Sequence, residues 1–116
     1  MGRVVKSSRS PPCRENLAAG AEAMALARRI GLEPAQVVDV INASSGASWI
    51  FADRMPRALA GDYAPRAAAR ILAKDVGIAA ALAARHHAEA TFARAAHAAF
   101  QATVAAGYGD ADAERL

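Results

Sequence analysis

Apolar and polar positions along this chain repeat with the period of a helix and not with that of a strand. Larger apolar residues recur every three or four positions, and no segment shows the every-second-residue alternation of a half-buried strand. The pattern predicts an all-α fold, a bundle of about five helices. The expected helices cover residues 15–30, 34 to about 42, 49 to about 55 with a short turn to 59, 65 to about 86 or 87, and about 89–106.

The first fourteen residues do not share this pattern. Residues 6–14 contain Ser, Pro and Arg with no apolar period, which is typical of coil. We therefore predict an irregular segment over residues 1–14 and one all-α domain over residues 15–116. A chain of 116 residues is long enough for one domain, and too short for a core plus a separate cofactor-binding domain.

Residues with strong local preferences mark the ends of the expected helices. Gly31 follows two arginines and ends the first helix, and Pro34 suits the first position of the second. The Ser48 hydroxyl is expected to cap the third helix. Pro56 predicts a kink or a break inside that helix, because proline lacks a backbone donor.

The hydrophobic content is high but rests largely on alanine. Hydrophobic residues make up 54% of the chain, and the alanine methyl contributes little burial energy, so the helices must pack closely. The Ala-rich faces either meet another domain or a second copy of the chain, as in a homo-oligomer, or belong to a loosely stable small bundle. The larger apolar residues of the first helix are Leu17, Met24 and Ile30. In the second helix Val37, Val40 and Ile41 are predicted to form a buried face, and in the fourth Ile71, Ile78 and Leu82 share one face with Asp75.

Charge and composition argue against several classes of protein. The net charge of +3 is scattered along the chain and is not interleaved with aromatic residues, so no nucleic-acid partner is expected. Charged residues interrupt every Ala-rich stretch, so no membrane span is expected either. The single Cys13 fits a reducing cytoplasm and is a poor nucleophile candidate. The three histidines lack the spacing of a metal site.

Two features are candidates for anion binding. Arg66, Arg70 and Lys74 follow one another at intervals of four residues, so their like charges repel on one helix face. An anionic ligand would offset that repulsion. Alternatively, the helix face is solvated and Asp62 or Asp75 offsets the repulsion. The spacing alone favours this second alternative. The Ser/Gly loop at residues 44–48 is similarly either a turn and cap or an anion-binding helix N-terminus. No glycine-rich dinucleotide or phosphate-binding loop is present, so the chain cannot form a complete cofactor site.

The order of three motifs carries a family resemblance. NASSGxSW begins at Asn42, GDYxPR ends at Arg66, and a Lys-Asp pair stands at Lys74 and Asp75. This order resembles the C-terminal helical domain of the β-hydroxyacid dehydrogenases, a 6-phosphogluconate-dehydrogenase-like domain, over residues 15–109. The family includes 3-hydroxyisobutyrate dehydrogenase, tartronate semialdehyde reductase and L-threonate dehydrogenase. The motifs are most similar to the L-threonate dehydrogenase branch.

The resemblance implies half of an NAD(P)-dependent oxidoreductase site for a small hydroxy acid. The other half would come from an upstream Rossmann domain that is not in this chain, so we expect the chain alone to be inactive. The resemblance implies that Lys74 reaches the cofactor, NAD or NADP, while Asp75 holds the helix in place. It implies substrate contacts at Ser45, Gly46 and Arg66. The alternative is a non-catalytic helical module that forms a dimer or docks onto a partner.

The family's catalytic lysine lies in a GxxxKxxxN motif near the start of a long interdomain helix. Gly2 and Lys6 match the first part of this motif, but Ser10 stands in place of the asparagine. In the predicted coil Lys6 would lack the rigid setting that proton transfer requires. The length between Lys6 and Glu22 agrees with the family although the residue types of 7–14 do not. Two compensating shifts of reading frame would explain this, and translating the DNA one base over should then yield an apolar helical segment.

Overall fold

The chain folds into helices alone over the residues that the structure describes. The computed structural model describes residues 2–61 and 69–108, and these contain no strand. The predicted all-α class with five helices is confirmed. The elements are α1 (Gly2–Arg29), α2 (Pro34–Asn42), α3 (Trp49–Leu59), α4 (Ala69–Arg85), α5 (Thr91–Thr103) and a π-helical turn, η1 (Val104–Tyr108).

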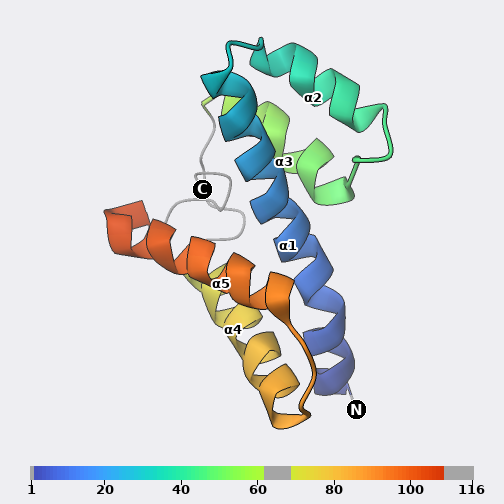
Figure 1. The fold of residues 1–116 in the computed structure, drawn as a ribbon, viewed down its shortest axis with the longest axis vertical. Helices are drawn as coiled ribbons and strands as arrows, with labels where there is room; N and C mark the ends of the chain where they lie inside the picture. The colour runs from blue at the N-terminus through green and yellow to red at the C-terminus, as the bar shows by residue number, and fades with distance from the viewer. Residues whose placement is uncertain (1, 62–68, 109–116) are drawn as a thin grey trace.

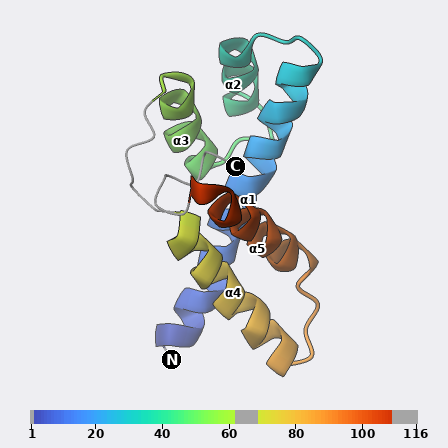
Figure 2. The same cartoon turned by 90° about the vertical axis from the view of Figure 1, so that its left-hand side faces the viewer.

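The long helix α1 is the axis of the fold and contacts each of the other four α-helices. Figures 1 and 2 show α2 and α3 beside its C-terminal half, while α4 and α5 pair with each other and cross its N-terminal half. The core lies where these layers meet α1. Its most deeply buried side chains come from four different helices: Leu17, Phe51, Val76 and Phe100.

The N-terminal segment corrects the sequence prediction. Residues 6–14, predicted as coil, belong to the single helix α1, which begins at Gly2. The Ala-rich half of α1 has high helix propensity and is packed on its neighbours, so it serves as the nucleus. Once a helix is nucleated, each added residue gains a hydrogen bond, and the helix extends through a stretch with poor local preference. Extension continues through Pro11 and Pro12 even though neither supplies a backbone donor.

Most of the predicted helix ends agree with the structure. Gly31 has φ of 85° just after α1, a left-handed conformation that favours glycine, and Pro34 begins α2. The Ser48 hydroxyl accepts a hydrogen bond from the Phe51 N–H at 3.2 Å and caps α3 as predicted. The Glu33 side chain, not identified from the sequence, caps α2 in the same way.

The predicted interruption at Pro56 is wrong, because α3 continues through it to Leu59. Proline at this position removes the donor that would bond the Ala52 carbonyl one turn earlier. Both Pro56 and Ala52 are exposed, so water can hydrate that carbonyl. The helix therefore tolerates the missing bond.

The buried face of α2 differs from the predicted one. In α2, Val38 is buried with 4% of its surface exposed, whereas Val40 is 68% exposed. Ile30, one of the larger apolar residues of the first helix, is exposed just after α1. The reason is that α2 packs against both α1 and α3, and its position between them decides which side is covered.

The same shift occurs in α4. Leu72 and Val76 are buried, whereas Ile71 and Ile78, the larger apolar residues noted on one face of this helix, remain exposed. α4 contacts α1 and α5 at once, so its buried face is centred between two neighbours and not on its bulkiest residues. The predicted start of this helix at Pro65 lies outside the described residues.

Candidate functional site

The Lys-Asp pair lies in the second turn of α4, and its two side chains have different surroundings. The Asp75 carboxylate accepts a hydrogen bond from Arg14 Nη2 at 3.1 Å, an ion pair that joins α4 to α1 across 61 residues of sequence. The neighbouring Lys74 is exposed, and over residues 2–61 and 69–108 it forms no ion pair. Asp75 thus braces the helix from which Lys74 projects.

Arg14, the partner of Asp75, was not predicted from the sequence. It stands in the segment that was predicted as coil, so its position on α1 could not be foreseen. The sequence offered only one clue to this ion pair, the opposite charge of Arg14 and Asp75. This clue does not single out Arg14, because the chain has fourteen Lys and Arg residues.

Of the basic stripe formed by Arg66, Arg70 and Lys74, the structure describes Arg70 and Lys74. Arg70 and Lys74 are both exposed and lie one turn apart on α4, as predicted. Arg66 lies outside the described residues, as does Asp62, one of the two carboxylates expected to relieve the stripe. The other, Asp75, has its Oδ2 bonded to Arg14 on the side that faces α1.

The Ser/Gly loop between α2 and α3 is a hydrogen-bonded turn. The Ser44 hydroxyl donates to the Ile41 carbonyl at 2.9 Å and accepts from the Gly46 N–H at 3.3 Å. Ser45 and Gly46, the predicted substrate contacts, are both exposed. The loop leads directly to Trp49, whose surface is 73% exposed. Its geometry is that of a turn and cap that leaves Ser45 accessible.

Lys6 lies on α1, not in a coil. Eight residues separate it from Arg14, which corresponds to about 12 Å along the helix axis. Ser10 follows Lys6 by four residues, about one turn of α1. The regular backbone that the sequence analysis found lacking is therefore present around Lys6.

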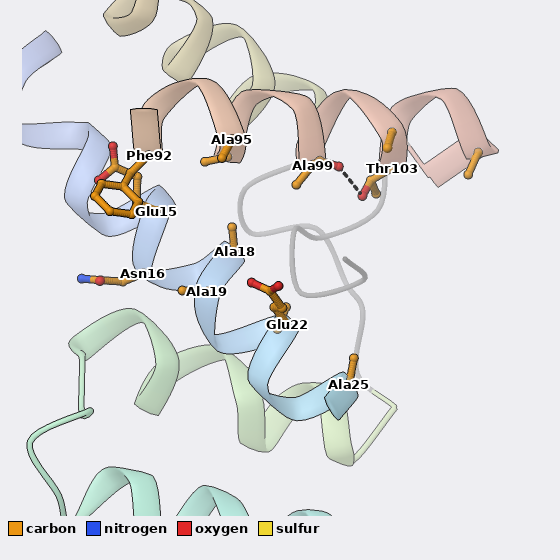
Figure 3. Close-up of a pocket in the computed structure, with 14 residues that line it drawn as sticks. Glu15, Asn16, Ala18, Ala19, Glu22, Ala25, Phe92, Ala95, Ala99 and Thr103 are labelled. Carbon is orange, nitrogen blue, oxygen red and sulfur yellow. Dashed lines mark hydrogen bonds between the residues drawn. The ribbon is translucent and has the colours of Figure 1, made fainter. Parts of the chain in front are cut away.

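Two hollows are lined in part by residues of α1. A cavity of about 200 Å³ lies between α1, α3 and the start of α4. A wider groove of about 890 Å³ separates α1 from α5, and its walls are mostly alanine with Glu15, Glu22 and Phe92. Figure 3 shows the Glu22 carboxylate and the methyl groups of Ala18 and Ala95 at this groove. The Ala-rich faces are predictable from the sequence, whereas the groove forms only where α1 and α5 face each other.

Residues 2–61 and 69–108 offer neither a metal-ligating cluster nor a membrane-spanning helix. No group of three or more His, Cys, Asp and Glu side chains there is arranged to hold a metal ion. No helix among the same residues is long and apolar enough to cross a bilayer.

Comparison with known proteins identifies the family. Residues 2–116 match the family described as the NAD-binding domain of NADP-dependent 3-hydroxyisobutyrate dehydrogenase. The chain belongs to this family. The L-threonate dehydrogenase of Cupriavidus necator is 41% identical over 97 residues, which cover 84% of this chain and 33% of that protein. The L-threonate dehydrogenase of Escherichia coli K12 is 38% identical over 112 residues, covering 97% of this chain and 37% of that protein.

Solved structures agree with this assignment. A 3-hydroxyisobutyrate dehydrogenase from Salmonella typhimurium superposes with a TM-score of 0.91 at 38% identity, over 94% of this chain and 38% of that one. The 3-hydroxyisobutyrate dehydrogenase of Mycobacterium tuberculosis, determined with L-serine, gives 0.85 at 26% identity, over 97% and 41% of the two chains. The predicted family, fold class and NAD(P) cofactor class are confirmed. The chain spans between 33% and 41% of the length of these relatives.

Proposed function

We propose that this chain is the C-terminal helical domain of an NAD(P)-dependent dehydrogenase that acts on a small hydroxy acid. The substrate belongs to the L-threonate, 3-hydroxyisobutyrate or tartronate semialdehyde class. The observation that carries the proposal is the family match over residues 2–116 together with the L-threonate dehydrogenases at 36–41% identity. The chain works with an upstream Rossmann domain, which supplies the remaining contacts to the dinucleotide.

The described residues fit one side of a dinucleotide site. Lys74 and Arg70 present two exposed cations on one face of α4, which suits the phosphates and hydroxyls of a dinucleotide. The Arg14–Asp75 ion pair holds that face in a fixed relation to α1. When bound, the nicotinamide exchanges a hydride with the substrate carbon. In this arrangement Lys74 binds the cofactor and Asp75 positions the helix.

Substrate contacts are proposed at Ser45, Gly46 and Arg66. Ser45 and Gly46 are exposed beside the α3 N-terminus, where the helix dipole favours a carboxylate. Lys6 is the candidate that holds and moves the proton at the substrate oxygen. Its place on α1 supports this role, whereas Ser10 removes the amide that the family motif has one turn later.

Activity measurements test the proposal in two steps. The isolated chain, mixed with L-threonate or 3-hydroxyisobutyrate and with NAD or NADP, should produce no change in absorbance at 340 nm. A clear rate would contradict the need for a second domain. Fused behind the dinucleotide-binding domain of the Cupriavidus necator relative, the chain should support NAD(P) reduction.

Lys74→Ala in that fusion should raise the KM for the dinucleotide by about tenfold, the effect of losing one charge-assisted hydrogen bond. Arg28→Ala, which removes an exposed cation at the far end of α1, should leave KM unchanged. If the KM for the dinucleotide were the same in both variants, Lys74 would not bind the cofactor. The DNA upstream of the chain should also encode a Rossmann domain in one of its frames.

The second candidate is a non-catalytic helical module that forms a homo-oligomer. The observation that favours it is the Ala-lined groove between α1 and α5, where Phe92 is 76% exposed. Ala95→Arg, inside the groove, should then convert a dimer to a monomer in analytical ultracentrifugation. Ala23→Arg, an exposed position of α1 outside the groove, is the matched control. A monomeric parent chain would exclude this candidate.

A further inference from the structure

The ion pair between Arg14 and Asp75 joins the two helices that carry the lysines of the proposed site. Arg14 follows Lys6 by eight residues on α1, and Asp75 directly follows Lys74 on α4. Nη2 of Arg14 donates to Oδ2 of Asp75 at 3.1 Å. The two lysines are therefore linked through about 12 Å of helix α1, this ion pair and the bond between two neighbouring residues of α4.

The two members of the pair depend on each other. Within residues 2–61 and 69–108, the Asp75 carboxylate accepts a hydrogen bond from Arg14 alone, and Arg14 donates to Asp75 alone. Nε of Arg14 is buried and has no hydrogen-bond partner there, so the guanidinium is tied to α4 through Nη2. If Arg14 is replaced, no second polar contact from the described residues holds the Asp75 side chain.

The surroundings of Arg14 fix the direction from which it approaches Asp75. Its stem shares the wall of a cavity of about 200 Å³ with the apolar side chains of Leu17, Trp49 and Leu72. The Arg14 side chain is 22% exposed, against 36% for Asp75. A long basic side chain commonly lays its stem along apolar surface and keeps its charged end at the edge. The guanidinium is thus held at the border of the α1–α4 contact, where it meets Asp75.

The apolar contacts of α4 do not by themselves fix its rotation. The buried residues near the start of this helix are Leu72, Ala73 and Val76. Burial of apolar surface depends on area and has no preferred direction, so it tolerates small rotations of a helix about its axis. A charge-assisted hydrogen bond depends on both distance and angle. The pair with Arg14 therefore helps to determine the direction in which Lys74 projects.

The pair matters more for placement than for stability. Partly exposed ion pairs contribute little to the free energy of unfolding. Reacting groups are far more sensitive to position, since a misplacement of about 1 Å can lower a rate about 100-fold. A weak contact can therefore have a large effect on activity if it sets the geometry between two functional side chains.

We infer that Arg14 is a positioning residue, which acts through Asp75 to set the place of Lys74 on α4 relative to Lys6 on α1. The inference rests on the proposed function, in which Lys74 binds the dinucleotide and Lys6 moves the proton at the substrate oxygen. Arg14 itself touches neither substrate nor cofactor. Its loss leaves both lysines on their helices and changes the geometry between them.

Kinetics of the fusion with the dinucleotide-binding domain of the Cupriavidus necator relative separate placement from stability. Arg14→Met keeps an unbranched side chain but removes the charge and the donors. It should lower kcat at saturating dinucleotide by about fivefold or more, within the range that misplacement produces. A residue that only stabilises the fold would lower Tm and leave kcat unchanged well below Tm. An unchanged kcat in Arg14→Met would thus overturn the inference.

Three matched variants identify the contact through which Arg14 acts. Arg14→Lys keeps the charge and should recover most of the parent kcat, and Arg28→Met, at the exposed far end of α1, should equal the parent. Asp75→Ala should lower kcat as Arg14→Met does. The double variant should be no worse than either single variant, because both remove the same contact. Additive losses would show that Arg14 acts through another group, and the inference would be wrong.

Lys74→Ala distinguishes a failure of this inference from a failure of the proposed function. If Lys74→Ala raises the KM for the dinucleotide while Arg14→Met has the kcat and KM of the parent, the proposed function stands and Arg14 has no positioning role. If Lys74→Ala leaves that KM unchanged, both are wrong.

A measurement without cofactor or substrate tests the geometry itself. Residual dipolar couplings of the backbone amides in the ¹⁵N-labelled chain report how α1 and α4 are oriented relative to each other. Arg14→Met should change this orientation, whereas Arg14→Lys and Arg28→Met should reproduce that of the parent. If the couplings of Arg14→Met fit the parent orientation, Arg14 does not position α4 and the inference fails.

Discussion

Gly20 is predicted to be required for the contact between α1 and α3. A Cβ atom built on Gly20 would lie 2.5 Å from Cδ2 of Phe51 and 3.1 Å from its Cε2. Carbon atoms in favourable contact are about 3.5–4.0 Å apart, so an added methyl overlaps the ring by about 1 Å. Phe51 is 2% exposed and packed in the core, so the ring cannot swing into solvent.

Two opposing effects set the size of the change on Gly20→Ala. Overpacking a filled core costs about 1–3 kcal/mol. Alanine in place of a helical glycine returns about 1 kcal/mol through helix propensity. The net expectation is a loss of about 1 kcal/mol in the free energy of unfolding, up to about 2, and a lowering of Tm by about 4–10 °C at this chain length.

Urea unfolding followed by circular dichroism at 222 nm measures this difference. A double-mutant cycle with Phe51→Leu isolates its cause, because leucine lacks the ring atoms that the Cβ would meet. Phe51→Leu alone destabilises the protein by leaving a cavity. In the Phe51→Leu background, however, Gly20→Ala should be neutral or stabilising. Gly20→Ala that raises stability in the parent chain would refute the reasoning, since propensity would then act unopposed.

Three further predictions concern the caps, faces and ion pair described above. Ser48→Ala should lower the free energy of unfolding by about 1 kcal/mol through loss of the α3 cap, and an unchanged urea midpoint would contradict the bond to Phe51. Val38→Ala should cost about 1–2 kcal/mol and Val40→Ala less than about 0.5, so equal losses would mean that α2 buries a different face. Asp75→Asn should cost no more than about 1 kcal/mol, because the pair is partly exposed, and the loss should shrink in high salt.

The sequence by itself determined the class of the fold and most of the helix ends. Gly31, Pro34 and Ser48 act within one turn of their own positions, so a local pattern suffices to predict them. The same holds for the motifs that identify the family, because their order along the chain is visible without a structure. The predicted helix ends agree with the structure because they depend on neighbours within about four residues.

Only the tertiary structure decided which faces are buried and which charges meet. Val38 replaces Val40 in the core because α2 is held between two helices, and the extension of α1 through residues 6–14 depends on a nucleus downstream. The Arg14–Asp75 pair joins residues 61 positions apart. Contacts of this kind arise from packing among several helices. Helical periodicity predicts which face of a helix is apolar, but it does not specify which neighbouring helix packs on that face.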